Sequence, residues 1–225
     1  MGKEMLKARR ASLERTVADV PLPLDTEAGD LPEDEDALSF SRSGQKLTRR
    51  ARKEIREFLR SDRRALVLSR EPKTDVVSQW MLVRNPLRTI LSYLIIQTCK
   101  LVPWMPLKIF LLRHCLGMRI GRNVGVAPVD FSPLFPELIS IGDNSAIGWK
   151  ATIGCHFFTH SKVILARVRI GRNVLVGALS TILPGVTIGD NAVVTVHSVV
   201  DRDIPPGEVW GGVPARRIQK LKKPM

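Results

Sequence analysis

The chain has 225 residues, 44% of them hydrophobic, which is enough for one domain with a core and some appendages. Its three cysteines form no CxxC pair, and their odd number argues against a disulfide framework. The net charge of +13 is compatible with nucleic acid or with an anionic membrane surface. We do not expect nucleic acid, because the positive charge flanks an apolar segment and is sparse in the repeats described below.

The N-terminal residues 1–40 contain few large apolar side chains and include an acidic run from Glu33 to Asp36. Such a segment buries too little apolar surface to offset its ordering entropy, so we predict that it is disordered. The stretch from Met1 to Arg15 is charged and has no apolar signal-peptide core. We therefore expect a cytoplasmic protein, with the inner face of the membrane as a further location.

Residues 41–118 are predicted to form a basic and apolar helical lead-in. Residues 43–64 have a helical apolar stripe that includes Ile55 and Phe58, with Ser43 as a plausible N-cap. Residues 87–101 and 107–116 are also helical in pattern, lack acidic residues and are separated by two prolines around Trp104. Two interpretations stay open: these two helices cover an open end of the repeats, or they lie in a bilayer interface.

Residues 119–213 have a period of six residues, which fits neither an α-helix nor a simple β-strand. A hexad period is typical of a parallel β-helix, in which each hexad supplies a short strand and a corner. We predict interruptions at 128–136 and 156–168, an end at Pro205 and Pro206, and a basic tail over 214–225 with a helical turn. The in-phase aliphatic positions are Ile141, Ile147, Ile153, Ile170, Val176, Ile182, Ile188, Val194 and Val200.

Several distinctive runs occur within residues 94–221: Pro136-Glu137-Leu138-Ile139, Ile141-Gly142-Asp143-Asn144, Cys155-His156-Phe157-Phe158, Leu183-Pro184-Gly185-Val186-Thr187-Ile188-Gly189-Asp190 and Val213-Pro214-Ala215-Arg216. These runs resemble the hexapeptide-repeat acyltransferases, in particular an acetyltransferase subgroup with a hydrophobic N-terminal lead-in. The resemblance implies a mainly-β fold: a left-handed parallel β-helix with an α-helical N-terminal extension. It also implies a homotrimer with active sites between subunits, and acyl transfer from acetyl-CoA without a metal.

His156 is the candidate general base, because an imidazole titrates near working pH and this residue lies where the repeats give way to a loop. It also matches the position of the catalytic histidine in the family. There a glutamate follows, where this chain has Phe157. Asp130, Asn144 and His160 are candidates for orienting the imidazole.

The coenzyme is expected along an edge of the coil. Acyl transfer needs an oxyanion donor, for which we expect a backbone N–H of Gly177 or Ala178. By resemblance, Ala178, Ser180 and Ser198 line the pantetheine slot through backbone and hydroxyl contacts. Basic groups are needed for the coenzyme's phosphates, and the tail supplies Arg216, Arg217 and Lys220 where the family keeps them.

Three functions compete. The first is transfer of acetyl from acetyl-CoA to a hydroxyl of a sugar, glycan or lipid-linked acceptor. The second is a zinc hydratase of the carbonic anhydrase type, which shares the trimeric coil but needs three histidines, of which only His156 and His160 lie close in sequence. The third is a non-catalytic coil that serves as a scaffold or binds a membrane through its basic lead-in.

Overall fold

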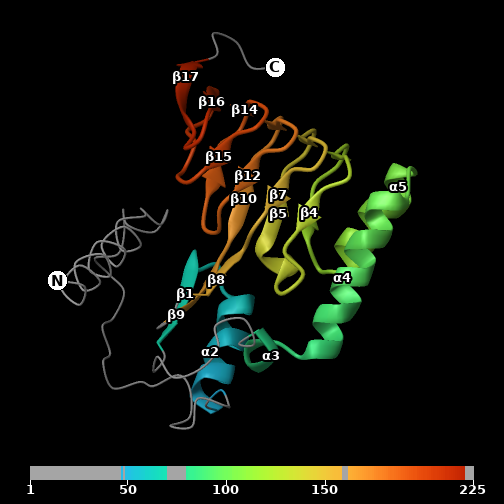
Figure 1. Ribbon diagram of the computed structural model, residues 1–225, viewed down its shortest axis with the longest axis vertical. Helices are drawn as coiled ribbons and strands as arrows, with labels where there is room; N and C mark the ends of the chain where they lie inside the picture. Colours follow the sequence, from blue (N-terminus) through green and yellow to red (C-terminus); the bar gives the residue numbers. More distant parts are fainter. Residues whose placement is uncertain (1–46, 48, 70–79, 159–161, 221–225) are drawn as a thin grey trace, which may run out of the picture.

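The computed structural model describes residues 47, 49–69, 80–158 and 162–220. The segment predicted to be disordered, 1–40, and the candidate N-cap Ser43 lie outside these residues, as do the last five residues of the basic tail. The rest divides into a coil of short parallel strands, a hairpin that leaves the coil, and helices at one end of the coil (Figure 1).

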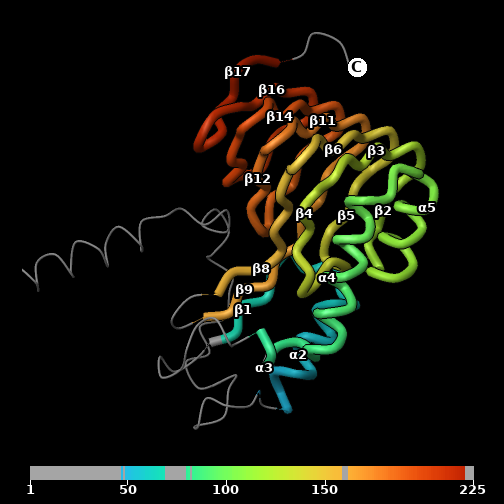
Figure 2. Tube along the Cα trace, turned by 45° about the vertical axis from the view of Figure 1, so that its right-hand side comes forward, coloured from blue at the N-terminus to red at the C-terminus, as the bar shows by residue number. Residues whose placement is uncertain are grey.

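The coil is a parallel β-helix whose three faces are separate sheets (Figure 2). The first face consists of β2 (Arg119–Ile120), β5 (Ile139–Ile141), β10 (Val168–Ile170) and β13 (Thr187–Ile188). The second consists of β3 (Gly125–Val126), β6 (Ala146–Ile147), β11 (Leu175–Val176), β14 (Val193–Val194), β16 (Glu208–Gly211) and β17 (Arg216–Lys220). The third consists of β4 (Asp130–Phe131), β7 (Thr152–Ile153), β12 (Thr181–Ile182) and β15 (Val199–Val200).

The hexad residues stack into buried ladders, which confirms their predicted shared axis. On the first face Ile170 pairs with both Ile141 and Ile188. The other two faces repeat this register with Ile147, Val176 and Val194, and with Ile153, Ile182 and Val200. All nine side chains are buried. Because stacked aliphatic side chains fill a narrow core at high density, the six-residue period is enough to set the fold.

The corners need left-handed backbone, and asparagine supplies it at four of them. Asn123 bonds Asn144 and Asn173 bonds Asn191 at 3.0 and 3.1 Å, so the amide side chains form ladders between successive coils. Asparagine tolerates positive φ better than most residues, which explains the Gly-Asp-Asn runs. Non-glycine residues at positive φ are Asn123, Asn144, Lys150, Asn173, Leu179, Asn191 and His197.

Two predicted boundaries of the coil are wrong. Asp130–Phe131 is a strand, with Phe131 paired to Ile153, so the first loop begins only after it and contains the 3-10 helix η4 (Pro136–Leu138). At the other end, Ile204 bridges to Ile188 and β16 adds one more strand beyond Pro205 and Pro206. Both segments pair with a neighbouring coil. This pairing outweighs the tendency of the nearby prolines to end a strand, on which the predicted boundaries were based.

The described part of the tail is a strand where a helical turn was predicted. β17 pairs antiparallel with β16, with a bulge between Val209 and Trp210. An edge strand exposes unpaired N–H and C=O groups, and β17 satisfies those of β16.

The predicted excursion after Ile153 is confirmed as a hairpin of β8 (His156–Phe158) and β9 (Lys162–Ala166), to which β1 (Ala65–Ser69) adds a third antiparallel strand. The basic helix α2 (Arg49–Arg60) precedes β1 and buries Ala51, Ile55 and Phe58. The buried Arg167 donates to the carbonyls of Phe58, Ser61 and Arg63 at 2.9, 2.6 and 3.0 Å. The guanidinium therefore ties the C-terminal end of α2 to the coil.

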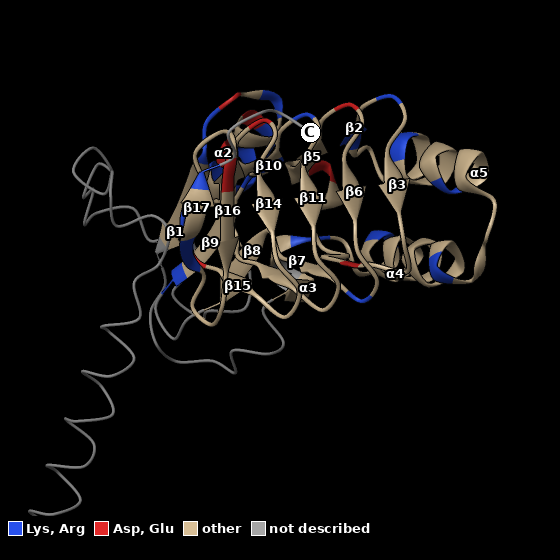
Figure 3. Cartoon of the chain, turned by 90° about the horizontal axis from the view of Figure 1, so that it is seen from above, with Lys and Arg blue, Asp and Glu red and all other residues tan. Residues whose placement is uncertain are grey.

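The helices α3 (Trp80–Val83), α4 (Pro86–Leu101) and α5 (Met105–Phe110) and the π-helical turn η3 (Leu111–Cys115) lead into the first coil. Asn85 caps α4 by accepting from the Leu87 N–H at 2.9 Å. Lys108 donates to the carbonyl of Val126 at 2.9 Å, and Arg113 to that of Ile120 at 2.8 Å. These side chains satisfy edge carbonyls of the first coil, so α4, α5 and η3, here termed the helical cap, cover its open end (Figure 3).

Candidate active site

His156 is the first residue of β8 and comes three residues after β7, at the corner between the third and first faces of the coil. Its Nδ1 lies 2.9 Å from Oγ of Ser132, the residue that directly follows β4 on the coil below. The ring of Phe158 packs against the imidazole with centroids 5.1 Å apart. A coil strand, a loop residue and the hairpin thus fix the imidazole.

Burial lowers the pKa of His156 to about 4, because desolvation disfavours the charged imidazolium. The imidazole is therefore neutral over the ordinary physiological range. A neutral imidazole has one nitrogen that accepts a proton and one that donates. In the tautomer in which Nδ1–H donates to Oγ of Ser132, Nε2 is the nitrogen that accepts a proton.

The neighbouring thiol is not a nucleophile. Cys155 is fully buried and donates to the carbonyl of Phe135 at 3.2 Å. Burial raises the pKa of this thiol to about 12, so the reactive thiolate is absent at neutral pH. Of the two adjacent polar side chains, only the imidazole is suited to proton transfer.

Two of the three residues considered for orienting His156 have other partners. Asp130 pairs with Lys100 of α4, and Asn144 bonds Asn123 in the corner ladder. His160 lies outside the described residues. The observed partner, Ser132, was missed by sequence reasoning, because nothing in the hexad pattern shows that the residue after Phe131 meets the loop one coil away.

The two predicted oxyanion donors, Gly177 and Ala178, have different outcomes. The N–H of Gly177 donates to the carbonyl of Val194 at 2.8 Å and is not free, so this half of the prediction is wrong. A Cβ at Gly177 would lie 2.5 Å from the N of Val196, so the glycine is there for close packing of coils. The N–H of Ala178 forms no hydrogen bond within the described part of the chain and stays a candidate donor.

Ser180 and Ser198 were predicted to offer hydroxyls to the coenzyme, and their burial contradicts this. Both side chains are fully buried, and both hydroxyls donate to the carbonyl of Thr195, at 2.9 and 2.7 Å. A serine at these positions satisfies a backbone carbonyl inside the coil. The hydroxyls of these two serines are therefore not available to line a coenzyme slot.

Two of the three basic tail residues that were predicted to bind phosphate lie close to carboxylates of the chain. Arg216 lies 3.6 Å from Asp201, and Arg217 lies 3.2 Å from Glu208. Lys220 is exposed. The arginine side chains are about half exposed and remain accessible to a phosphate, but each starts from an ion pair with a different carboxylate.

The histidine and the expected slot lie on different edges of the coil. His156 is at the corner between the third and first faces, whereas Ala178 lies between β11 of the second face and β12 of the third. The corner of Ala178 also carries a line of exposed apolar side chains, from Trp149, Leu179, Val196 and Val213. One chain therefore does not bring the predicted base and slot together.

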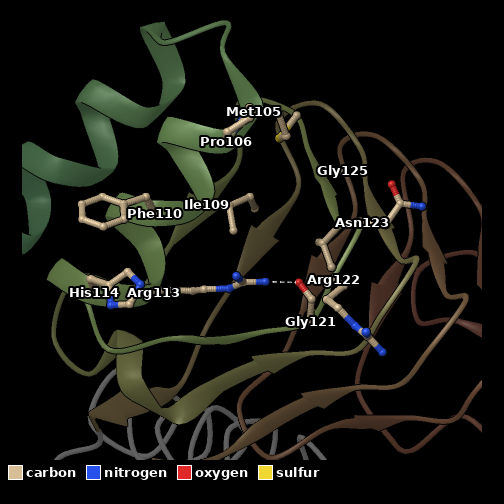
Figure 4. A pocket seen from close by; sticks show the side chains of 11 residues that line it. Met105, Pro106, Ile109, Phe110, Arg113, His114, Gly121, Arg122, Asn123 and Gly125 are labelled. Atoms are coloured by element: carbon tan, nitrogen blue, oxygen red, sulfur yellow. Dashed lines mark hydrogen bonds between the residues drawn. The ribbon is translucent and has the colours of Figure 1, made fainter.

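A cavity of about 610 Å³ lies elsewhere, between the helical cap and the first coil (Figure 4). Arg113 crosses it to the carbonyl of Gly121, and Phe110, His114 and Asn123 are also in its lining. None of the predicted site residues lines this cavity.

Within residues 47, 49–69, 80–158 and 162–220, no three His, Cys, Asp or Glu side chains are grouped so that they could hold a metal ion. In the same residues, every helix is too short or too polar to cross a bilayer.

Comparison with known proteins places the chain in a family. Residues 167–202 match the model "Bacterial transferase hexapeptide (six repeats)". YvoF of Bacillus subtilis strain 168, whose name assigns it as an acetyltransferase, is 36% identical over 164 residues, which cover 68% of this chain and 95% of YvoF. Galactoside O-acetyltransferase of Escherichia coli K12 is 36% identical over 112 residues, covering 47% of this chain and 55% of that enzyme.

Solved structures agree on the fold. A hexapeptide-repeat acetyltransferase of Vibrio cholerae, VCA0836, has a TM-score of 0.50 at 23% identity, covering 61% of this chain and 92% of that one. A galactoside acetyltransferase in complex with coenzyme A also has a TM-score of 0.50, at 24% identity, with 74% and 90% covered. The predicted left-handed β-helix with an N-terminal helical part is confirmed. The chain belongs to the hexapeptide-repeat acetyltransferases.

Proposed function

We propose that this acetyltransferase moves acetyl from acetyl-CoA to a hydroxyl of a sugar, glycan or lipid-linked acceptor, with His156 as the general base. The observation that carries the proposal is the neutral imidazole at the start of the hairpin, with its Nδ1 on Ser132. Two relatives support the donor and the acceptor class: one is named a galactoside O-acetyltransferase, and VCA0836 has been solved in complex with acetyl coenzyme A.

In this mechanism Nδ1–H of His156 donates to Ser132, which leaves the Nε2 lone pair for the acceptor. Nε2 takes the proton of the acceptor hydroxyl as its oxygen attacks the thioester carbonyl carbon. The C–O bond forms, and the carbonyl oxygen becomes an oxyanion, stabilised by the N–H of Ala178. The oxyanion then collapses, the C–S bond breaks, and the leaving thiolate takes the proton from His156. No covalent enzyme intermediate is needed, in keeping with the protonated Cys155.

We further propose that the site forms between copies of the chain in a homotrimer. His156 of one copy would face the Ala178 corner of the next, because these two edges of the coil do not meet within a chain. The exposed apolar side chains beside Ala178 offer surface for such a contact. Arg216 and Lys220 would hold the phosphates of coenzyme A, since the strand β17 continues the second face beyond the last coil.

The test is a screen of sugar and glycan acceptors with acetyl-CoA, followed through release of the free thiol. The His156→Ala variant should lose about 10²–10⁴-fold in turnover, as expected for loss of a general base. Its coenzyme affinity and oligomeric state should match those of the parent. Transfer that survives at the parent's rate in this variant would remove His156 from the reaction.

A further inference from the structure

The helix α4 turns its most apolar side away from the protein. Its buried residues are Thr89, Ser92, Ile96 and Cys99, three of which are small or polar. Residues Leu87, Ile90, Leu91, Leu94 and Leu101 recur at intervals of three, four and seven, which places them on the opposite side of the helix. Helices of water-soluble domains normally show the reverse arrangement.

The exposure of these side chains is large. Leu87 is 77% exposed and Leu101 85%, and Trp104, at the junction of α4 and α5, is 65% exposed. We term these residues the outer cap face: Leu87, Ile90, Leu91, Leu94, Leu101 and Trp104. The face lies at the end of the coil opposite to β16 and β17 (Figures 1 and 3). Contiguous exposed apolar surface of this kind marks an interaction site.

The surroundings of this face are cationic. No Asp or Glu occurs from residue 76 to residue 129. The same stretch contains seven basic residues: Arg84, Arg88, Lys100, Lys108, Arg113, Arg119 and Arg122. Figure 3 shows basic residues without acidic ones on the helices at this end.

Beside α4, basic and apolar groups also meet in one cavity of about 460 Å³. Leu87, Leu91 and Ile95 line it together with Arg84 and Arg88. Arg88 is well exposed and lies 4.0 Å from Glu137, at the limit of an ion pair, so its guanidinium is accessible. An apolar wall next to guanidinium groups matches an amphiphile that carries an acyl chain and a phosphate.

We propose that the outer cap face docks the protein onto an anionic phospholipid bilayer. The apolar side chains enter the interface, exposed basic groups such as Arg88 contact lipid phosphates, and Trp104 takes the interfacial position that tryptophan prefers. At 16 residues, α4 is shorter than the roughly 20 residues of a membrane span, so it lies along the surface. The coil then projects away from the bilayer, with the cap between them.

A second copy of the chain is the other conceivable occupant, and charge disfavours it. Self-association through this face would bring together two copies of helices that carry Arg and Lys but no Asp or Glu, and like charges across an interface oppose pairing. A bilayer with acidic lipids supplies the missing negative charge.

The test is co-sedimentation of the full-length chain with vesicles of phosphatidylglycerol and phosphatidylcholine, and with phosphatidylcholine alone. We expect binding to the acidic vesicles and a marked loss of binding in high salt, because screening weakens exposed charge contacts. The Leu91→Glu/Leu94→Glu variant should bind at least about tenfold more weakly, since two apolar side chains leave the interface. The control Lys53→Glu makes the same change in net charge on α2 and should bind as the parent does.

A second measurement does not depend on those variants. Lipids brominated in their acyl chains should quench the tryptophan fluorescence of the parent, and the Trp104→Phe variant should lose most of this quenching. Equal binding by the double Glu variant and the parent overturns the proposal, as does quenching that survives in Trp104→Phe. Failure of the parent to bind acidic vesicles overturns it too. A concentration-dependent oligomer that the double variant abolishes, without lipid binding, would identify a second copy as the occupant.

Discussion

His156 is positioned by a contact that spans 24 residues of sequence. Ser132 reaches it because the coil places the end of β4 directly below the end of β7. The residue that follows His156 is Phe157, and the hydrogen-bond partner of the imidazole is the uncharged hydroxyl of Ser132. A hydroxyl fixes the ring without raising its proton affinity, and burial then lowers the pKa to about 4.

The first prediction concerns pH. A lowered pKa means that the neutral imidazole persists as pH falls, so kcat/KM should stay flat down to about pH 5 and decline only towards pH 4. An unperturbed histidine would instead begin to lose activity near pH 6.5. The measurement is the pH profile of kcat/KM with acetyl-CoA, with circular dichroism at each pH to exclude unfolding. An acid limb centred near pH 6.5 would contradict the burial argument.

The second prediction concerns Ser132 as a positioning residue. In Ser132→Ala the imidazole loses the partner of Nδ1 and its fixed tautomer, so kcat should fall by about tenfold while the KM for acetyl-CoA stays constant. Ser132→Thr keeps the hydroxyl and should recover much of the activity. The matched control is Ser140→Ala, whose hydroxyl bonds the carbonyl of Val168 on the first face. An equal loss in both alanine variants would indicate a general effect on the coil.

At the scale of elements, the helical cap covers the open end of the coil, where backbone groups would otherwise be unpaired. The first coil has no preceding coil to pair with, and the cap covers it with side-chain donors in place of a strand. Lys108 is buried with its amine on the carbonyl of Val126, and Arg113 reaches the carbonyls of Ile120 and Gly121. Both residues belong to the helical cap, whose helix α4 carries the outer cap face.

The third prediction tests this capping. Lys108→Met keeps the aliphatic length but leaves the buried carbonyl of Val126 unpaired, so the free energy of unfolding should fall by about 1–3 kcal/mol. Lys53→Met, on the exposed side of α2, should change it by less than about 0.5 kcal/mol. Urea denaturation followed by circular dichroism measures both. Hydrogen exchange should locate the loss of protection in β2 and β3, and a loss spread evenly over the coil would count against a local cap.

At the scale of the whole molecule, the separation of base and slot is the main consequence of the fold. The three corners of each coil face different directions, so two residues share an edge only when they occupy the same corner, and His156 and Ala178 occupy different corners. The proposed trimer resolves this, because closed rings of identical chains bring unlike edges together.

The fourth prediction is complementation between two inactive variants. His156→Ala lacks the base, and Ala178→Trp should block the slot on the other edge. Co-refolded in equal amounts and assorted at random, about a quarter of the sites in a trimer would combine an intact His156 with an intact Ala178 corner. Transfer should return to about that share of the parental rate. Mixed samples that stay inactive, although they form mixed trimers by mass, would place both groups within one chain.

The sequence by itself determined the coil, the excursion at His156 and the family. Aliphatic side chains with a six-residue period share one core when the chain turns a corner after every hexad, and the corner residues are visible in the sequence. The tertiary structure decided what depended on neighbours one coil away. It paired His156 with Ser132, engaged Asp130 with Lys100, occupied the N–H of Gly177, and turned the hydroxyls of Ser180 and Ser198 inward. It also turned the leucines of α4 outward. Periodicity fixes which side chains share a face, but which face is buried depends on what the rest of the chain brings against it.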